Sequence, residues 1–329
     1  MPIVWLERHQ VLLYLVSILG GAGIGLVAPA VSPVLESGIN PVLGLLLFAT
    51  FLSVPLVQVG AAFRDIRFLL VVLSVNFLVV PVVVFGLSRF VSGNEALLLG
   101  LLLVLLTPCV DYVVVFTGLA GGARDRLLAA APLLMLLQLV LLPGYLWLFA
   151  GAQTTGLIET GPFVEAFVGL ILIPLVAAAM VQWWARSART GRAVRRVESV
   201  MATAMVPLMM ATLAVVVGSQ IAAVGDQFTQ LVALIPLYVA FLVIMLGIGI
   251  TAGRLTRLDV AGTRALVFSV STRNSLVVLP LALALPATFA LTPLAVVTQT
   301  LVELVGMVIF VRLVPRLVPP GTVKPRAQP

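Results

Sequence analysis

Two residues of opposite charge stand in the middle of apolar runs, Asp111 in Leu97–Leu119 and Arg273 in Ala265–Leu285. An ionised group at the centre of a membrane helix costs about 2.5 kcal/mol or more, so each marks a functional site by default. Because an arginine cannot shed its charge, pairing would remove much of the cost of both. We expect the two side chains to meet, either in a static salt bridge or in a gate that changes with cargo.

Both runs are interrupted near their centres. The segment Thr107–Asp111 breaks the first, and Ser271–Ser275 breaks the second. Pro108 cannot donate a backbone hydrogen bond, so a carbonyl near Val104 loses its helical partner. Freed backbone groups at membrane depth are tolerated only around a cavity or against protein. The breaks therefore predict a polar site in the bilayer.

Cys109 lies beside Pro108 in the first break. A thiol there could ligate a soft solute such as trivalent arsenic or antimony. The alternative is structural, since free cysteine usually behaves as a small buried hydrophobe. The sequence leaves both interpretations open.

Glu303 and Gln299 are four residues apart and share one helix face. A carboxylate there could bind a coupling proton or cation, or it could simply bond to a helix neighbour. Buried amides often join helices rather than bind cargo. We predict substrate contact at Cys109, Asp111, Arg273 and Asn274, and ion coupling at Glu303, Gln299 and Asn76.

These residues need a membrane scaffold. The chain is 62% hydrophobic and 9% charged, with a mean hydropathy of +1.23, and its single cysteine excludes an internal disulfide. The first apolar run is expected to be a retained helix, not a signal peptide. Ten runs have spanning length, with approximate cores at 11–31, 41–61, 67–88, 96–119, 127–150, 163–184, 200–221, 230–251, 264–285 and 292–314.

Loop charge tests the number of spans. With ten spans, 17 of the 19 basic residues fall on the side of the N-terminus, while Arg89 lies on the other side and Arg273 inside a run. This bias predicts a multi-pass protein of the plasma membrane with both termini cytoplasmic. The five arginines of Arg186–Arg196 are expected to face anionic lipid.

Ten spans divide into two halves of five at the outer loop Gly151–Gly161, giving residues 1–155 and 156–329 within one membrane domain. An odd number of spans in each half inserts the second half upside down. The interrupted runs are then the fourth of each half. Inverted repeats of this kind support alternating access in secondary transporters.

The sequence excludes several other classes. It has no His-Glu-x-x-His zinc pattern, no Walker phosphate loop and no Gly-x-Ser-x-Gly elbow. We predict no enzymatic activity and no cofactor. The basic residues are spread over short loops and form no single patch, so no nucleic-acid partner is expected. Transport energy would come from an ion or solute gradient.

The chain resembles the bile acid/sodium symporter superfamily over nearly its whole length, and within it the arsenite permease (arsenical-resistance-3 type) branch. The resemblance is carried by Pro108-Cys109, Val113–Ala120, Gly122–Asp125 and Leu301-Val302-Glu303. It implies an all-α fold of ten helices in two inverted five-helix repeats. Helices four and nine would be discontinuous and cross at the midplane, and a panel would pack on a core.

By the same resemblance, the family's required cysteine falls on Cys109 and its required acidic residue on Glu303. Asp111 and Arg273 depart from the arsenite branch. The leading hypothesis is efflux of arsenite or antimonite in exchange for protons. The alternative is a sodium-coupled symporter of a small organic anion attracted by Arg273. A membrane receptor or scaffold, the third possibility, would not need buried charge at the breaks.

Overall fold

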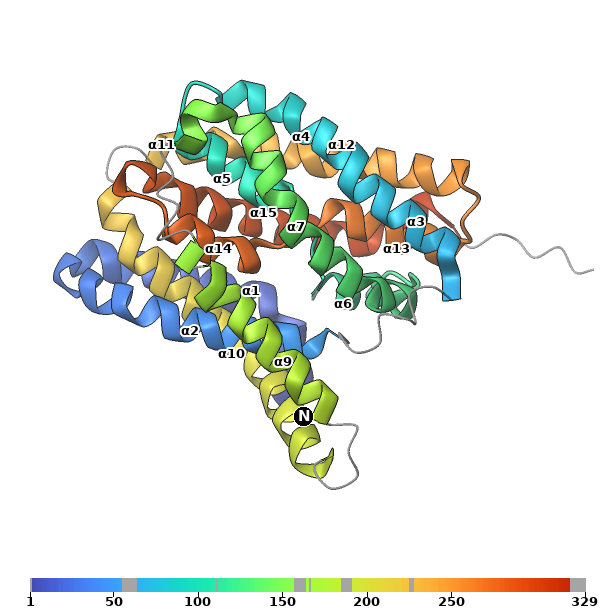
Figure 1. Ribbon diagram of the computed structural model, residues 1–329, viewed down its shortest axis with the longest axis horizontal. Coiled ribbons are helices and arrows are strands. Elements are labelled where there is room, and N and C mark those ends of the chain that lie inside the picture. Colours follow the sequence, from blue (N-terminus) through green and yellow to red (C-terminus); the bar gives the residue numbers. More distant parts are fainter. Residues whose placement is uncertain are drawn as a thin grey trace, which may run out of the picture.

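The computed structural model describes residues 2–54, 64–110, 112–156, 164–165, 167–184, 191–224 and 228–319. Nearly all of this chain is helical (Figure 1). In chain order the helices are α1 (Pro2–Val27), η1 (Pro29–Val31), α2 (Ser32–Ser53), α3 (Ile66–Ser74), η3 (Val75–Val79), α4 (Val80–Ser88), η4 (Arg89–Val91), α5 (Glu95–Leu105), α6 (Tyr112–Leu119), α7 (Arg124–Gly156), η5 (Phe167–Leu172), α9 (Ile173–Trp184), α10 (Gly191–Val224), α11 (Phe228–Val232), α12 (Leu234–Leu255), α13 (Val260–Ser271), α14 (Ser275–Leu283), η7 (Ala287–Phe289) and α15 (Leu291–Leu317).

The length and surface of these helices suit a bilayer. Within the described residues, seven helices are long and apolar enough to cross a membrane, and three shorter helices are also apolar. Large apolar side chains face outward along them, such as Val82 at 71% exposed and Val140 at 75%. Water would penalise such a surface and lipid would not. The chain is a multi-pass membrane protein.

Several predicted boundaries shift. The second run was expected over 41–61, but α2 already begins at Ser32. Pro33 lies in the first turn of α2, where its missing N–H and fixed φ are tolerated, and Pro41 is accommodated inside the helix. The first run was expected over 11–31, but α1 covers Pro2–Val27.

The helices form two bundles. The panel consists of α1, α2, α9 and α10 with the short helices η1 and η5, and the core bundle holds the remaining helices (Figure 1). Each bundle draws helices from both sides of residue 155. The bundles touch where α14 meets α2 and where α15 meets α1 and α10.

Small residues set the spacing inside the panel. A Cβ atom added to Gly21 of α1 would collide with the carbonyl oxygen of Ala214 of α10, and one added to Gly25 would collide with that of Gly218. In lipid, helices associate through such close backbone packing, because the hydrophobic effect does not drive apolar helices together there. Close backbone packing therefore sets the distance between α1 and α10.

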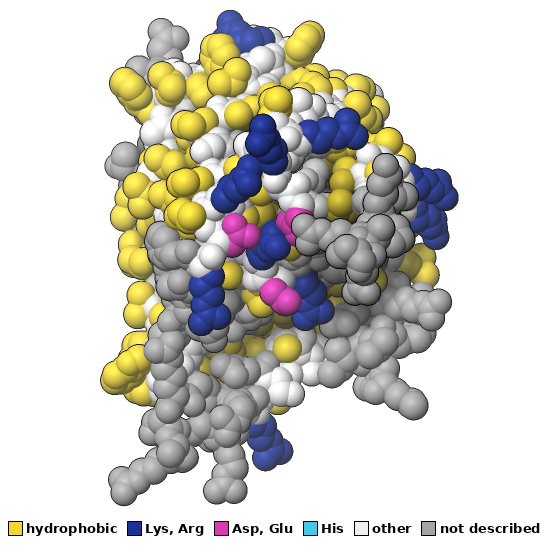
Figure 2. All heavy atoms as spheres, turned by 90° about the vertical axis from the view of Figure 1, so that its right-hand side faces the viewer, with side chains coloured by type: hydrophobic (Ala, Val, Ile, Leu, Met, Phe, Trp, Pro, Cys, Tyr) yellow, Lys and Arg dark blue, Asp and Glu magenta, His cyan; other side chains and the backbone are white. Residues whose placement is uncertain are grey.

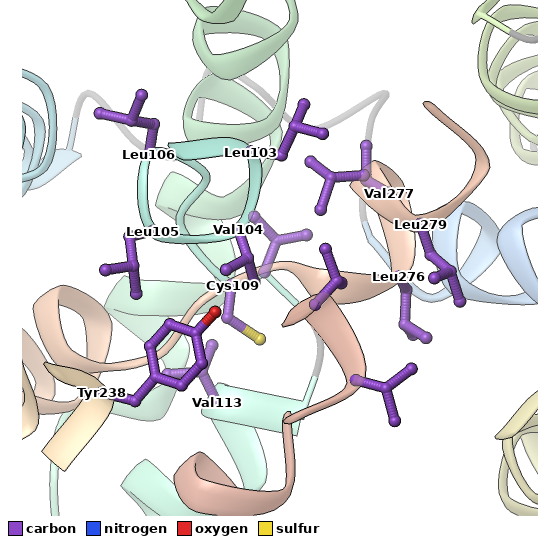
Figure 3. Close-up of a cluster of buried hydrophobic side chains, with 14 of the residues drawn as sticks. Leu103, Val104, Leu105, Leu106, Cys109, Val113, Tyr238, Leu276, Val277 and Leu279 are labelled. Atoms are coloured by element: carbon purple, nitrogen blue, oxygen red, sulfur yellow. The ribbon is translucent and has the colours of Figure 1, made fainter. Parts of the chain in front are cut away.

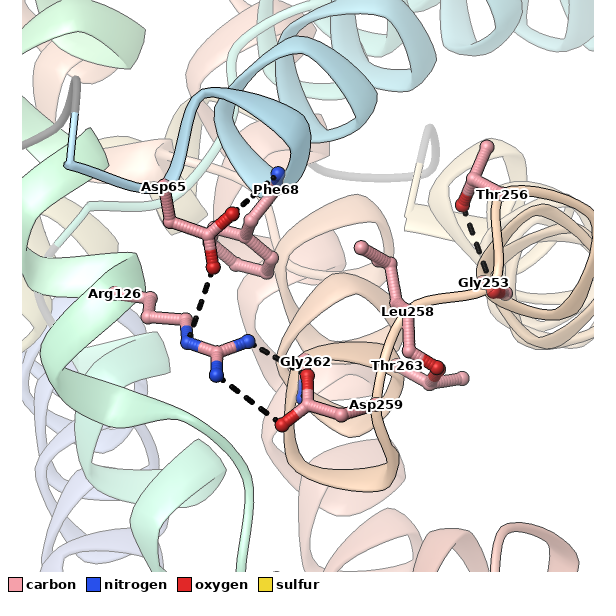
Figure 4. Close-up of polar contacts among 9 residues, drawn as sticks. All are labelled: Asp65, Phe68, Arg126, Gly253, Thr256, Leu258, Asp259, Gly262 and Thr263. Atoms are coloured by element: carbon pink, nitrogen blue, oxygen red, sulfur yellow. Dashed lines mark hydrogen bonds and ion pairs between the residues drawn. The ribbon is translucent and has the colours of Figure 1, made fainter.

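Charged side chains gather at one end of the molecule (Figure 2). There Asp65 caps α3 through the N–H of Phe68, and Asp259 caps α13 through the N–H of Gly262. The guanidinium of Arg126, at the start of α7, bridges the two carboxylates (Figure 4). The loops that contain Asp65, Arg126 and Asp259 thus meet at one end of the molecule. The basic residues in these loops had predicted that all three lie on the same side of the membrane.

Candidate functional site

The two predicted helix breaks are present and lie against each other. Residues between α5 and α6 pair with those between α13 and α14 as a short antiparallel bridge. The N–H of Cys109 donates to the carbonyl of Thr272 at 3.2 Å, and the N–H of Asn274 donates to that of Thr107 at 2.8 Å. The bridge satisfies backbone groups that the helices leave open.

Local sequence explains where the helices stop and restart. Pro108 supplies no N–H, and the carbonyl of Val104 instead accepts from the hydroxyl of Thr107 at 3.0 Å. This carbonyl is the one that the sequence predicted to lose its partner. On the other chain segment, the side chain of Asn274 caps α14 by accepting from the N–H of Val277 at 3.3 Å.

Arg273 is the largest fully buried side chain of the described protein. Its Nη2 donates to Asn76 Oδ1 at 3.0 Å and to the carbonyls of Ser269 and Val270 at 3.0 and 2.7 Å. Its Nη1 donates to the carbonyl of Leu105 at 3.3 Å. The guanidinium therefore sits against the C-terminal ends of two half-helices.

A π-helix positions Asn76 for this contact. Asn76 is fully buried in η3, and its Nδ2 donates to the carbonyl of Val72 at 3.0 Å and to Ser269 Oγ at 3.1 Å. Short π-helical turns often occur at functional sites. The amide predicted for ion coupling thus orients the guanidinium of Arg273.

Glu303 is fully buried on α15 and accepts three hydrogen bonds. Its Oε2 accepts from Gln299 Nε2 at 2.5 Å and from the main-chain N–H of Arg273 at 2.8 Å. Its Oε1 accepts from the hydroxyl of Tyr112 at 2.5 Å. The shared helix face predicted for Gln299 and Glu303 is confirmed.

Sequence reasoning missed Tyr112. Its hydroxyl also lies 3.1 Å from the carbonyl oxygen of Arg273, so the ring at the start of α6 touches both the carboxylate and the second break. The available signal was a phenol directly after an interrupted apolar run. Asp111, the preceding residue, lies outside the described residues, and its pairing with Arg273 stays a prediction.

Cys109 is fully buried in an apolar cluster formed by α5, α6, α12 and α14 (Figure 3). Among the labelled neighbours are Val104, Val113 and Leu276. The described part of the chain contains no group of three or more His, Cys, Asp or Glu side chains that could hold a metal ion. Most of the labelled side chains around the thiol are apolar.

A cavity of about 230 Å³ lies between the panel and the core bundle. Val110, Tyr112 and Leu276 line it from the two breaks, and Tyr14 and Met209 line it from the panel. Its walls are mostly apolar, and Cys109 is not among the described residues that form them. The starts of α6 and α14 both reach this cavity.

A second cavity of about 420 Å³ lies at the opposite end of the same boundary. Glu36 and Asn40, near the start of α2, line it together with Ala282 at the end of α14. Ser53, at the end of α2, lines the first cavity instead. The two cavities thus flank the paired breaks from opposite ends.

Of the ten buried polar side-chain atoms of the described chain that lack a hydrogen-bond partner, four lie at the second break and one lies on α15. Among the described residues these buried atoms include Ser271 Oγ, Arg273 Nε, Asn274 Nδ2, Ser275 Oγ and Gln299 Oε1. Buried polar groups are normally satisfied, and exceptions often mark sites of ions, water or ligands. The arrangement suits a polar ligand or an exchangeable ion.

Paired broken helices with a buried carboxylate and flanking cavities define a membrane carrier. A family model, the Sodium Bile acid symporter family, matches residues 40–231, and the chain belongs to that family. Its members are transporters rather than enzymes, and the chain is a secondary transporter of the sodium-coupled or a related type. A search of curated proteins finds no match. The matched segment includes Asn76 and Cys109 and ends before Arg273.

Proposed function

We propose that this protein carries a small organic anion with an apolar body, and that proton exchange at Glu303 drives the transport. The observation that carries this proposal is the first cavity, whose walls are mostly apolar and which meets the N-terminal starts of α6 and α14. Helix N-termini carry positive partial charge, and half-helix N-termini in carriers point at anionic substrate groups. The apolar walls suit the body of the solute, and the N-termini of the two helices suit its negative charge.

The family description supports the same class of solute. It names bile acid, which combines an apolar body with one anionic group, and it names sodium as the partner ion. In this chain the buried carboxylate is surrounded by donors. The oxygens of Glu303 accept from Tyr112, Gln299 and the main chain of Arg273. A sodium ion needs several acceptor atoms, and these three neighbours act as donors, so they offer it few ligands beyond the carboxylate itself. Protonation of the carboxylate is the coupling event that we propose.

Tyr112 provides the link between solute and ion. Its side chain lines the cavity, and its hydroxyl holds Glu303. A solute against the ring changes the position of the hydroxyl, and protonation of Glu303 changes what the hydroxyl can donate to. Each event then alters the free energy of the other, which is what coupling requires.

Uptake by the purified protein in lipid vesicles tests this function. Labelled taurocholate and a short aliphatic carboxylate are offered under an imposed proton gradient or an imposed sodium gradient. We expect uptake of an organic anion that follows the proton gradient. Uptake that follows sodium alone would assign the alternative coupling ion, and no uptake of any organic anion would refute the proposed solute class.

A cavity-filling variant sharpens the test. Leu276→Trp places a larger side chain in the cavity. If this overpacking weakens solute binding by about 1.4 kcal/mol, uptake should fall about tenfold. Val140→Trp is the matched control, because Val140 is 75% exposed on the outer face of α7. Equal effects of both variants would contradict a solute site at Leu276.

Efflux of arsenite or antimonite in exchange for protons is the second candidate function. The observation for it is the place of Cys109, whose N–H is part of the bridge between the breaks. A ligand on the sulfur would act directly on that pairing. Cys109→Ser exchanges a soft ligand for a hard one and keeps the shape. If the variant loses arsenite transport and keeps organic-anion uptake, the result favours Cys109 as the arsenite site. Unchanged arsenite resistance would refute this second candidate function.

The proposal includes ten spans in two inverted halves. The seven long spans and the three short apolar helices support this number, with α5–α6 and α13–α14 each forming one interrupted span. Both termini would face the cytoplasm of a plasma-membrane protein, as the loop charges predict. Labelling of intact cells with an impermeant thiol reagent tests the orientation. Ser92→Cys should react from outside and Arg257→Cys should not; the opposite pattern would invert the topology.

A further inference from the structure

Four oxygen atoms surround the guanidinium of Arg273, and three of them belong to the main chain. They are the carbonyl oxygens of Leu105, the last residue of α5, and of Ser269 and Val270 in the last turn of α13. The fourth is Oδ1 of Asn76. We call these four atoms the oxygen cage.

The cage has the character of a cation site. The C-terminal ends of helices carry negative partial charge, and in carriers such ends and unwound carbonyls coordinate the transported cation. The ring of Phe241 lies 5.4 Å from the guanidinium carbon and adds a further attraction for positive charge. The site is closed to water, since Arg273 is fully buried.

We propose that the Arg273 guanidinium is a tethered cation, occupying an oxygen cage that would otherwise take a free monovalent cation such as sodium. The positive charge at the breaks is then a permanent part of the chain. Transport needs no sodium at this position. This inference goes beyond the proposed function, because it concerns a second cation position and does not depend on which solute is carried.

Removal of the side chain tests the cage without any transport assay. Arg273→Ala leaves the main-chain carbonyls in place and opens a small polar space. The purified variant is unfolded by heat in a series of NaCl or guanidinium chloride concentrations, with choline chloride holding the ionic strength constant. We expect a saturable rise in melting temperature of about 3 °C once the cation reaches ten times its dissociation constant. The wild type should show no saturable rise with sodium.

Two further variants control the experiment. Arg264 is also buried and also donates to main-chain carbonyls, those of Ala120 and Val318, but it lies at the start of α13. Arg264→Ala should gain no saturable response to sodium. The double variant Arg273→Ala with Asn76→Ala lacks one cage oxygen, and its apparent cation affinity should be about tenfold weaker, as expected for loss of one ligand contact of about 1.4 kcal/mol.

Several results would overturn the proposal. A folded Arg273→Ala protein without a saturable response to sodium or guanidinium would do so, as would a saturable sodium response of the wild type. If Arg273→Ala does not fold, Arg273→Lys takes its place in the test. Lysine keeps a tethered charge, so the stability of this variant should remain insensitive to sodium. A gain of sodium dependence would refute the tethered cation. Failure of organic-anion uptake would leave these readouts unchanged, so the two proposals can fail separately.

Discussion

Two charged regions of this molecule use the same chemical groups in opposite surroundings. At the paired breaks, Arg273 and Glu303 are fully buried and held by hydrogen bonds of 2.5 to 3.3 Å. At the charged end, Arg126 bridges Asp65 and Asp259, but the three side chains are 37% to 51% exposed. Solvent screens the second group and cannot reach the first.

The comparison shows that the loss of a charged partner costs more stability at the breaks than at the charged end. A partner lost from the breaks leaves an uncompensated charge in a medium that cannot solvate it, whereas water replaces a partner lost at the charged end. The buried group is therefore sensitive to protonation and to solute contact. The exposed group caps helices and fixes the ends of α3, α7 and α13.

The largest effect is expected for Glu303→Leu. The change removes a buried negative charge near Arg273 and the acceptor for three hydrogen bonds, so the free energy of unfolding should fall by about 3–5 kcal/mol. Thermal or denaturant unfolding in detergent measures it. Glu36→Leu, at an exposed carboxylate of α2, should change stability by about 0.5 kcal/mol or less. Equal stability of the two variants would contradict the comparison.

Asn76→Ala should come next. It removes the acceptor for Arg273 Nη2 and the donor to Ser269 Oγ, and a hydrogen bond to a charged group contributes about 1.5–3 kcal/mol. The same unfolding assay measures the loss. Asn40→Ala changes an exposed amide and serves as the control. A loss no greater than that of the control would show that the carbonyls alone hold the guanidinium.

Tyr112→Phe should cost about 1 kcal/mol of stability and should uncouple transport. Without the hydroxyl, solute contact no longer alters Glu303, so gradient-driven uptake should fall relative to exchange of solute at equilibrium. Tyr238→Phe is matched to it, since its buried hydroxyl bonds to the carbonyl of Ala295 at 3.0 Å, away from Glu303. The idea fails if both variants change the ratio of driven uptake to exchange alike.

The smallest effect is expected at the charged end. Arg126→Ala should lower the free energy of unfolding by about 0.2–1 kcal/mol, and the difference should shrink in 1 M salt, where the screening length is about 3 Å. Unfolding at low and high salt measures both. A loss above about 3 kcal/mol that salt does not reduce would place this network in the same class as the buried one.

Much of the scaffold could be read from the sequence. Long apolar runs predict membrane helices because lipid leaves the backbone few alternatives. Pro108 and the polar run Ser271–Ser275 predicted the breaks, since each disrupts helical bonding or packing locally. The four-residue spacing of Gln299 and Glu303 predicted their contact, because helix geometry alone brings such residues together.

The partners of Arg273 were decided by the tertiary structure. The sequence predicted Asp111 as a partner, and that residue lies outside the described residues. It gave no sign of the described contacts of the guanidinium, which are Asn76 and three main-chain carbonyls. Carbonyl oxygens carry no sequence signal, because every residue supplies one. Only the approach of α5, η3 and α13 turns them into a cage. Likewise, only packing between the panel and the core bundle gives Tyr112 a cavity on one side and Glu303 on the other.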